Sequence, residues 1–233
     1  MNAIEFMARP APTARRPLLG LTILLVEDSR FASEAVRLVA QRSGARLRRA
    51  DCLAAARRHL GTYRPDVVIV DLGLPDGSGL ELLAELACGR GCPDVLLATS
   101  GCDAAAAEAA ARVAGADGCI AKPMDGVAEF QAAVLRHLPR EDQPQGLRPV
   151  TADRVEPDRL ALAEDLAHAA RALSDARVPH AYVAAFLVGL ARADRDAEMA
   201  ERVAAFARRG GQEAGDALRA LVERRAEGAR AIP

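Results

Sequence analysis

Residues 67–77 read Val-Val-Ile-Val-Asp-Leu-Gly-Leu-Pro-Asp-Gly, an apolar run that ends in one carboxylate, Asp71, and is followed by a turn. Four apolar β-forming residues in succession are typical of a strand buried on both faces, as in a parallel sheet covered by helices. Open α/β sheets bind their ligands outside the carboxyl ends of the strands. An isolated Asp at this place would be interpreted as a loop cap, so the neighbouring strands decide the role of Asp71.

The segments on either side of this run alternate between strand and helix patterns. We expect strands at 22–26, 45–50, 67–71, 94–99 and 119–121, and helices at 29–41, 51–60, 77–88, 104–114 and 125–138. The second strand is the most polar and therefore belongs at a sheet edge. Five strands that alternate with five helices predict an α/β domain, a doubly wound parallel sheet with helices on both faces and right-handed crossovers.

Polar side chains follow four of the expected strands. The first strand ends at Glu27 and Asp28, the third at Asp71, the fourth at Ser100 and the fifth at Lys122. In a parallel sheet these ends meet at one edge, where three carboxylates would repel one another unless a cation joined them. Hard oxygen ligands suit Mg²⁺. Transfer of a phosphoryl group to a carboxylate requires a metal beside that carboxylate, and an ammonium and a hydroxyl that bind the phosphoryl oxygens.

The composition of the basic residues distinguishes Lys122 from the other positions. Of the 31 lysines and arginines, Lys122 is the single lysine. The planar guanidinium of arginine cannot replace a compact ammonium where a point charge must fit a tight site. We therefore expect Lys122 to have a specific role.

Residues 21–139 resemble the receiver domain of bacterial two-component response regulators. The resemblance rests on Leu-Leu-Val-Glu-Asp at 24–28, the run from Val68 through Leu83, Ala-Thr-Ser-Gly at 98–101, and Gly-Ala-Asp-Gly-Cys-Ile-Ala-Lys-Pro at 115–123. It implies a flavodoxin-like, five-stranded parallel fold. It also implies a phosphoacceptor signalling protein rather than an enzyme, with at most slow self-dephosphorylation.

The resemblance assigns roles to the residues at the strand ends. Asp71 would be the phosphoacceptor, receiving a phosphoryl group from a histidine kinase or a histidine phosphotransferase. Glu27 and Asp28 would hold Mg²⁺ together with Asp71 and the backbone carbonyl of Gly73. Spacing back from the lysine selects Ser100, rather than its neighbour, as the hydroxyl that binds the phosphoryl group.

The same resemblance describes the last strand and shows one departure. Lys122 would pair with the phosphoryl group, and the Lys122–Pro123 bond would be cis. The family often has Tyr or Phe three residues before the lysine as an aromatic switch, but this chain has Cys119 there. We interpret Cys119 as a buried strand residue in preference to a redox switch, and we expect an atypical readout of phosphorylation.

The segments outside this domain have other properties. Residues 1–20 combine arginines with prolines and lack the apolar core of a signal peptide, so we expect a flexible leader. No run approaches the 18 apolar residues of a membrane span, which predicts a cytoplasmic protein without membrane contact. Residues 140–157 are proline-rich and charged, and we expect a linker there.

Residues 158–230 predict an all-α bundle with amphipathic helices at about 158–173, 179–191, 194–208 and 212–225. The aromatic content of the whole chain is 3%, so the core of this bundle should be thin. A homodimer or a partner helix would complete it.

Three hypotheses describe what the bundle does. The leading one is protein–protein contact with a downstream signalling target. The second is DNA binding as a transcriptional regulator. From residue 150 onward, 13 arginines face 14 acidic residues, a net charge of −1, so we do not expect nucleic acid as the principal partner. The third is a phosphotransfer bundle that uses His168, although a lone histidine on a polar helix face is ordinarily only solvated.

Overall fold

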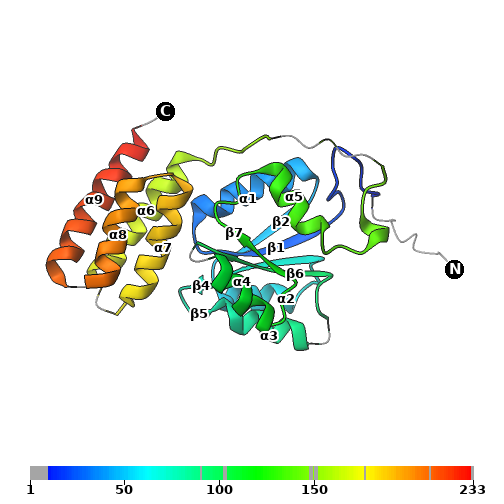
Figure 1. The fold of residues 1–233 in the computed structure, drawn as a ribbon, viewed down its shortest axis with the longest axis horizontal. Helices are drawn as coiled ribbons and strands as arrows, with labels where there is room; N and C mark the ends of the chain where they lie inside the picture. Colours follow the sequence, from blue (N-terminus) through cyan, green and yellow to red (C-terminus); the bar gives the residue numbers. More distant parts are fainter. Residues whose placement is uncertain are drawn as a thin grey trace.

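The computed structural model describes residues 10–89, 91–101, 104–146, 149, 152–175, 177–209 and 211–231. Its first portion, called the α/β part here, alternates strands and helices, and its second, called the bundle, is helical (Figure 1). The strands are β1 (Thr22–Val26), β2 (Arg46–Ala50), β3 (Val67–Asp71), β4 (Gly73–Leu74), β5 (Gly77–Ser78), β6 (Val95–Ser100) and β7 (Gly118–Ala121). The helices of the α/β part are α1 (Arg30–Ser43), α2 (Leu53–Leu60), α3 (Gly79–Cys88), α4 (Ala104–Val113) and α5 (Val127–Leu135), followed by the 3-10 turn η1 (Arg140–Asp142).

Five strands form one parallel sheet in the order β2-β1-β3-β6-β7. Helices α1 and α5 pack on one face of this sheet, and α2, α3 and α4 pack on the other. The predicted doubly wound parallel fold is confirmed, including the edge position of the polar strand β2. All five residues of β3 are buried, because this strand lies at the centre of a sheet covered on both faces. The winding direction reverses between β1 and β3, so a crevice opens at their carboxyl ends.

The loop after β3 is more ordered than the sequence pattern indicated. Instead of a plain turn, β4 and β5 form a two-stranded antiparallel hairpin. The carboxylate of Asp76 at its tip accepts hydrogen bonds from the backbone N–H groups of Leu53 and Ala54, at 2.8 and 3.0 Å. The hairpin is thereby fixed to the start of α2, and this fixes the segment that leaves Asp71.

The start of α3 passes very close to the end of β3 at Gly79. A Cβ atom added to Gly79 would lie 2.0 Å from the carbonyl oxygen of Asp71. The backbone N–H of Gly79 donates a hydrogen bond to the carbonyl oxygen of Leu72 at 3.2 Å. Because these neighbours are backbone atoms, a larger residue would shift the loop that carries Asp71.

We expect Gly79→Ala to lower the free energy of unfolding by about 3 kcal/mol, since the added methyl group overlaps backbone atoms that cannot rotate away. Urea denaturation followed by circular dichroism measures this loss. Gly73→Ala is the matched control, because a Cβ added at Gly73, in the same loop, has no atom within 4 Å among the described residues. Equal losses in the two variants would contradict the close approach at Gly79.

The bundle contains the four predicted helices, α6 (Arg159–Ser174), α7 (His180–Ala193), α8 (Ala197–Arg209) and α9 (Gln212–Arg230). Its core is aliphatic and includes the expected stripes, with buried side chains at Leu162, Leu166, Val183, Leu187, Leu190, Met199, Val203, Phe206, Leu218, Leu221 and Val222. Phe31 of α1 belongs to the same cluster although it comes from the α/β part. The thin core is thus extended by the neighbouring part of the same chain. None of the described helices is long and apolar enough to cross a bilayer.

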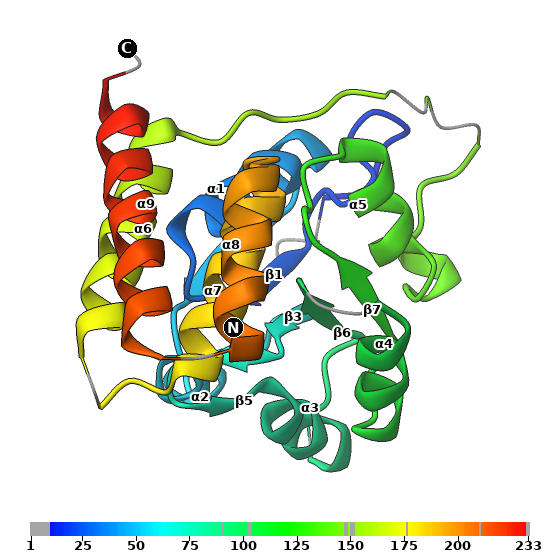
Figure 2. The same cartoon turned by 60° about the vertical axis from the view of Figure 1, so that its left-hand side comes forward.

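The bundle lies against the α/β part through α6 and α7, which contact α1 and β4 (Figures 1 and 2).

Ser29 caps α1 as predicted, with its hydroxyl oxygen accepting a hydrogen bond from the backbone N–H of Ala32 at 3.0 Å. Gly44 ends the helix with a φ of 92°, a left-handed conformation that favours glycine.

The predicted flexible leader and the predicted linker are both packed in part. Residues 1–9 of the predicted flexible leader lie outside the described residues, but Leu18 is fully buried in the core beside α1, so the prediction is wrong at the end of the leader. In the predicted linker, Val155 is buried and its backbone N–H donates to the carbonyl oxygen of Asp125 at 2.9 Å. In both places an apolar side chain is buried against the core of the α/β part, which is favourable. The composition of the two segments does not indicate this packing.

Candidate functional site

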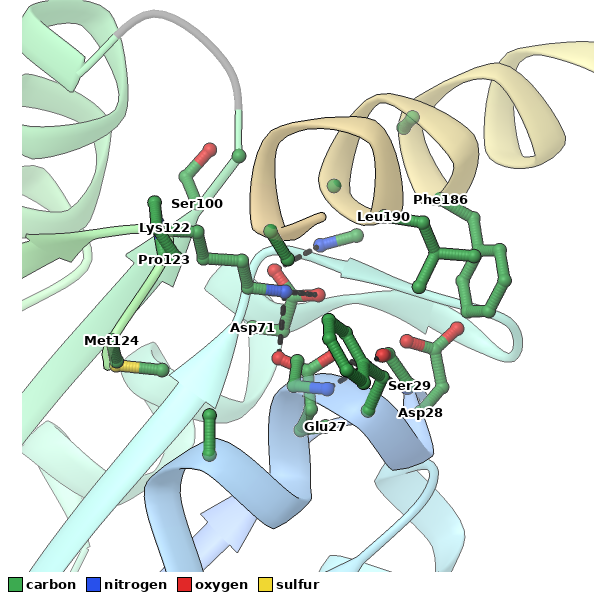
Figure 3. A pocket seen from close by; sticks show the side chains of 18 of the residues that line it. Glu27, Asp28, Ser29, Asp71, Ser100, Lys122, Pro123, Met124, Phe186 and Leu190 are labelled. Atoms are coloured by element: carbon green, nitrogen blue, oxygen red, sulfur yellow. Dashed lines mark hydrogen bonds and ion pairs between the residues drawn. The ribbon is translucent and has the colours of Figure 1, made fainter. Parts of the chain in front are cut away.

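The carboxyl ends of β1, β3, β6 and β7 bring together the side chains expected there (Figure 3). Ligand oxygens of Glu27, Asp28 and Asp71 all lie within 4.8 Å of one another. Lys122 and Ser100 line the same cavity. The sequence analysis therefore predicted the position of this cluster correctly; the roles of its members stay predictions.

Lys122 is the electrostatic centre of the cluster. Its ammonium Nζ lies 2.6 Å from Glu27 Oε2 and 2.8 Å from Asp71 Oδ2, and its side chain is 9% exposed. Burial opposes a charge at this place, but the two carboxylates outweigh burial and hold the pKa of Lys122 above its ordinary value. The single ammonium thus pairs with two buried carboxylates at once. The bond from Lys122 to Pro123 is cis, as predicted.

The backbone of the acidic pair is fixed by the edge strand. Arg49 of β2 donates from Nε to the carbonyl oxygen of Glu27 at 3.1 Å and from its terminal nitrogen to that of Asp28 at 2.6 Å. The backbone N–H of Ser29 donates to Glu27 Oε1 at 3.2 Å. The backbone of both residues and the carboxylate of Glu27 are therefore held at the start of α1 by groups outside the cluster.

The cluster fits a divalent cation. Three carboxylates from two strands offer hard oxygen ligands, and Gly73 lies exposed two residues beyond Asp71, where its backbone carbonyl is the expected fourth ligand. Burial, followed by the charges of Asp71 and Asp28, raises the pKa of Glu27 to about 8, although Lys122 opposes the shift. A cation would remove this repulsion, which is the physical reason to expect Mg²⁺ here.

We expect Mg²⁺ to bind more weakly as the pH falls through about 8, because the metal needs the ionised carboxylate of Glu27 and competes with a proton for it. The loss should approach about tenfold per pH unit below this pKa. Isothermal calorimetry between about pH 6 and pH 9 measures it. Glu27→Gln should remove the binding, and Glu85→Gln, at an exposed ion pair with Arg57, is the control. An affinity that stays constant over this range would contradict the expectation.

The structure distinguishes the two neighbouring hydroxyl residues at the end of β6. Ser100 is half-buried and lines the cavity. Thr99 is fully buried, and among the described residues its hydroxyl has no hydrogen-bond partner. This placement supports the choice of Ser100 as the hydroxyl that reaches a bound group.

Cys119 lies in β7 and packs at the border of the core formed with α2, α3 and α4. Burial raises the pKa of its thiol, which disfavours the reactive thiolate. This agrees with a strand residue rather than a redox switch. An aromatic side chain is indeed absent from this position of the strand.

Two residues of the bundle reach the cluster, and the sequence analysis missed both. Tyr182 of α7 donates its hydroxyl to Asp28 Oδ2 at 2.6 Å. Burial, together with the charge of Asp28, raises the pKa of this phenol above its ordinary value. Asp165 of α6 is buried and accepts one hydrogen bond from the hydroxyl of Ser29, the residue directly after Asp28. The only signal in the sequence was the position of Asp165 between two leucines of the predicted core. It did not indicate which residue Asp165 contacts.

His168 is exposed on α6, as expected for a polar face, and lies edge-on against Phe186 with ring centroids 5.8 Å apart. It lines a second cavity together with Asp28 and Tyr182. A phosphotransfer role for His168 stays a prediction.

Residues 23–134 match the model of the response regulator receiver domain. The KDP operon transcriptional regulatory protein KdpE of Escherichia coli (strain K12) is 34% identical over 119 residues, covering 49% of this chain and 52% of that protein. The probable transcriptional regulatory protein TcrX of Mycobacterium tuberculosis (strain ATCC 25618 / H37Rv) is 35% identical over 120 residues, covering 50% and 47%.

Among solved structures, a CheY-like response regulator receiver domain from Methylobacillus flagellatus covers 50% of this chain and 97% of its own, with 24% identity and a TM-score of 0.44. The chain spans about half the length of the curated relatives that it matches.

Proposed function

Residues 23–134 are a response regulator receiver domain, and on this premise we propose that the chain accepts a phosphoryl group on Asp71 from a histidine kinase or a histidine phosphotransferase. The observation that carries the proposal is the position of Asp71, which lies between the ammonium of Lys122 and the acidic pair Glu27 and Asp28. A nucleophilic carboxylate needs both a cation to accept phosphoryl oxygens and a metal site beside it.

The proposed transfer is a displacement at phosphorus. An oxygen of the Asp71 carboxylate bonds to phosphorus while the bond from phosphorus to the donor imidazole nitrogen breaks, and that nitrogen takes up a proton. Lys122 is positioned 2.8 Å from the attacking carboxylate, where it can pair with a phosphoryl oxygen once the group has arrived. Ser100 donates a hydrogen bond to another oxygen. Glu27, Asp28, Asp71 and the Gly73 carbonyl would hold Mg²⁺, which would neutralise part of the phosphoryl charge when bound.

The bundle would transmit the signal by protein–protein contact. Its net charge from residue 150 onward is −1, so no excess of positive charge favours nucleic acid. Its helices α6 and α7 already use side chains to bind a protein surface, that of the α/β part. These observations favour a protein target over DNA, in a cytoplasmic phosphorelay.

The test uses the full chain with phosphoramidate and Mg²⁺, followed by intact mass spectrometry. We expect the addition of one phosphoryl group that hydroxylamine removes, as it removes an acyl phosphate. No added mass under these conditions, with a folded protein, would reject Asp71 phosphorylation.

A DNA-binding regulator is the second candidate, because the printed names of KdpE and TcrX describe transcriptional regulatory proteins. An electrophoretic mobility shift with genomic fragments at physiological salt separates the two functions. Sequence-specific retardation by the full chain, before or after phosphorylation, would replace the protein-contact function with this one.

A further inference from the structure

A second cavity lies between the bundle and the receiver domain, beside the site of Asp71. Its volume is about 540 Å³, which is in the range of small-molecule sites. The bundle contributes residues of α6, α7 and α9 to its lining, and the receiver domain contributes residues near the carboxyl ends of β1 and β2. Among the described residues, only Asp28 and Phe186 line both cavities, so this one is a separate place for a ligand.

Two arginines that line this cavity lack a counter-ion. Of the four arginines in the described part of its lining, Arg30 pairs with Glu164, and Arg49 donates to two backbone carbonyl oxygens. The other two are Arg171 of α6 and Arg230 of α9, and neither guanidinium has a hydrogen bond or an ion pair with any described residue. Helices α6 and α9 lie side by side, and both arginines also line the groove between them (Figure 1). Two free guanidinium groups that face one cavity favour an anion, and their planar forks match the oxygens of phosphate.

Carboxylates line the cavity too, but most of them are already engaged. Asp28 and Asp165 accept the hydrogen bonds described above. Glu164 lies 2.6 Å from the guanidinium of Arg30. Asp51, just after β2, is exposed, and its carboxylate has no partner within the described ranges of the chain. A ligand in the cavity therefore meets free guanidinium groups on the wall formed by the bundle and one free carboxylate on the opposite wall.

Three rings form an aromatic surface beside the free arginines. The ring of Phe186 lies 5.8 Å from that of His168 and 6.1 Å from that of Tyr182, measured between centroids. The hydrogen bond from Tyr182 to Asp28 holds the phenol ring in place. His168 precedes Arg171 by three residues on α6, so the imidazole and the guanidinium lie on the same face of that helix. Aromatic side chains stack on the bases of nucleotides, whichever base is present.

From this juxtaposition we infer that the cavity binds a nucleotide. The phosphates lie at Arg171 and Arg230, and the base stacks on the surface formed by the three rings. The carboxylate of Asp51 accepts a hydrogen bond from the ribose or from an amine of the base. A bare anion would leave the rings in water, and an uncharged aromatic molecule would leave the arginines without a counter-ion. The inference goes beyond the proposed function and does not depend on it, because phosphoryl transfer to Asp71 uses the other cavity.

The experiment is isothermal calorimetry of the full chain with ADP and, separately, with GDP. The buffer contains EDTA, which keeps Mg²⁺ away from the acidic cluster beside Asp71. We expect at least one of the two nucleotides to bind with a Kd in the micromolar range.

Two fragments of the nucleotide test its two halves separately. Pyrophosphate keeps the charge and lacks the base, and the nucleoside keeps the base and lacks the phosphates. Because each fragment makes only part of the contacts, we expect each to bind at least about tenfold more weakly than the nucleotide.

Three variants place the ligand in this cavity. Arg171→Gln and Arg230→Gln each remove a charged hydrogen-bond donor to phosphate, and His168→Ala removes one ring of the stacking surface. We expect each of them to raise the Kd of the nucleotide by about tenfold. The matched controls are Arg224→Gln, at an exposed position of α9, and His59→Ala in α2, neither of which lines the cavity. Both should bind the nucleotide as the wild type does.

Cys52 provides a second measurement, because it lines the cavity and is half-buried. We expect the bound nucleotide to slow its alkylation by a maleimide, followed by peptide mass spectrometry. Cys88 and Cys92 are exposed and do not line the cavity, so their alkylation rates should stay the same.

Three results would overturn the inference. One is a folded protein that binds neither nucleotide at millimolar concentration and shows no protection of Cys52. Another is pyrophosphate that binds as tightly as the nucleotide, which would reduce the site to an anion-binding patch. The third is an unchanged affinity of the Arg171→Gln and Arg230→Gln variants, or an equal loss in Arg224→Gln, which would place the ligand elsewhere. Binding that needs both halves of the nucleotide and both arginines would support the inference.

Discussion

Asp71→Asn is expected to abolish phosphate incorporation from phosphoramidate and Mg²⁺, with a loss of at least about 100-fold in rate, because a neutral amide is not a nucleophile toward phosphorus. The substitution preserves the size of the side chain. Its amide can still lie near the ammonium of Lys122, which approaches Asp71 Oδ2 to 2.8 Å in the wild type. The fold should therefore persist, and the loss should be chemical. Intact mass spectrometry over time measures it.

The matched control is Asp76→Asn. This carboxylate belongs to the same loop, but it caps α2 and does not line the cavity. It should accept phosphate at the wild-type rate with a small loss of stability. Phosphate that persists in Asp71→Asn, and that hydroxylamine still removes, would assign the acceptor role to another carboxylate.

Lys122→Met should produce the second large effect, a loss of about 3 kcal/mol in the free energy of unfolding at neutral pH without Mg²⁺. The ammonium is buried between Glu27 and Asp71, and its removal leaves two carboxylates in a low-dielectric site without a cation. Proton uptake by Glu27, whose pKa burial already raises to about 8, limits the loss. Urea titrations at several pH values measure it, and the deficit should shrink as the pH falls and the carboxylates become neutral.

Mg²⁺ provides the second half of this experiment. A cation bound by the acidic cluster should restore part of the stability of the Lys122→Met variant, by an amount that grows with the metal concentration. Arg57→Met is the control, because it removes an exposed ion pair with Glu85 and should cost less than about 1 kcal/mol. Equal losses in the two variants, or no effect of Mg²⁺ on the lysine variant, would contradict a buried cation site.

The α/β part was predictable because its signals are local. A strand buried on both faces is recognisable in the sequence as an apolar run. The polar residue that follows it must lie at the edge of the sheet where the other parallel strands also end. Glu27, Asp71, Ser100 and Lys122 could therefore be placed together without any contact being known. The antiparallel hairpin β4–β5 escaped prediction, because two-residue strands are too short to show an alternation.

The contacts between the bundle and the α/β part could not be predicted, because they join residues far apart in the sequence. Tyr182 and Asp165 contact residues more than a hundred positions away, and their helical patterns report only which face is apolar. A tyrosine on an apolar stripe indicates a core position, and nothing in its surroundings names Asp28 as the acceptor. The absence of an aromatic residue at Cys119 suggested an atypical readout, but it gave no indication that α7 contacts the site directly through Tyr182 and Asp28.

Anchoring of the linker at Val155 sets the length of the tether that holds the bundle. Three residues separate Val155 from Arg159 at the start of α6. The start of α6 can therefore lie no farther than about 14 Å from Val155. A tether of this kind gives an effective concentration on the order of millimolar or above. A donor kinase competes against that local concentration whenever it approaches Asp71.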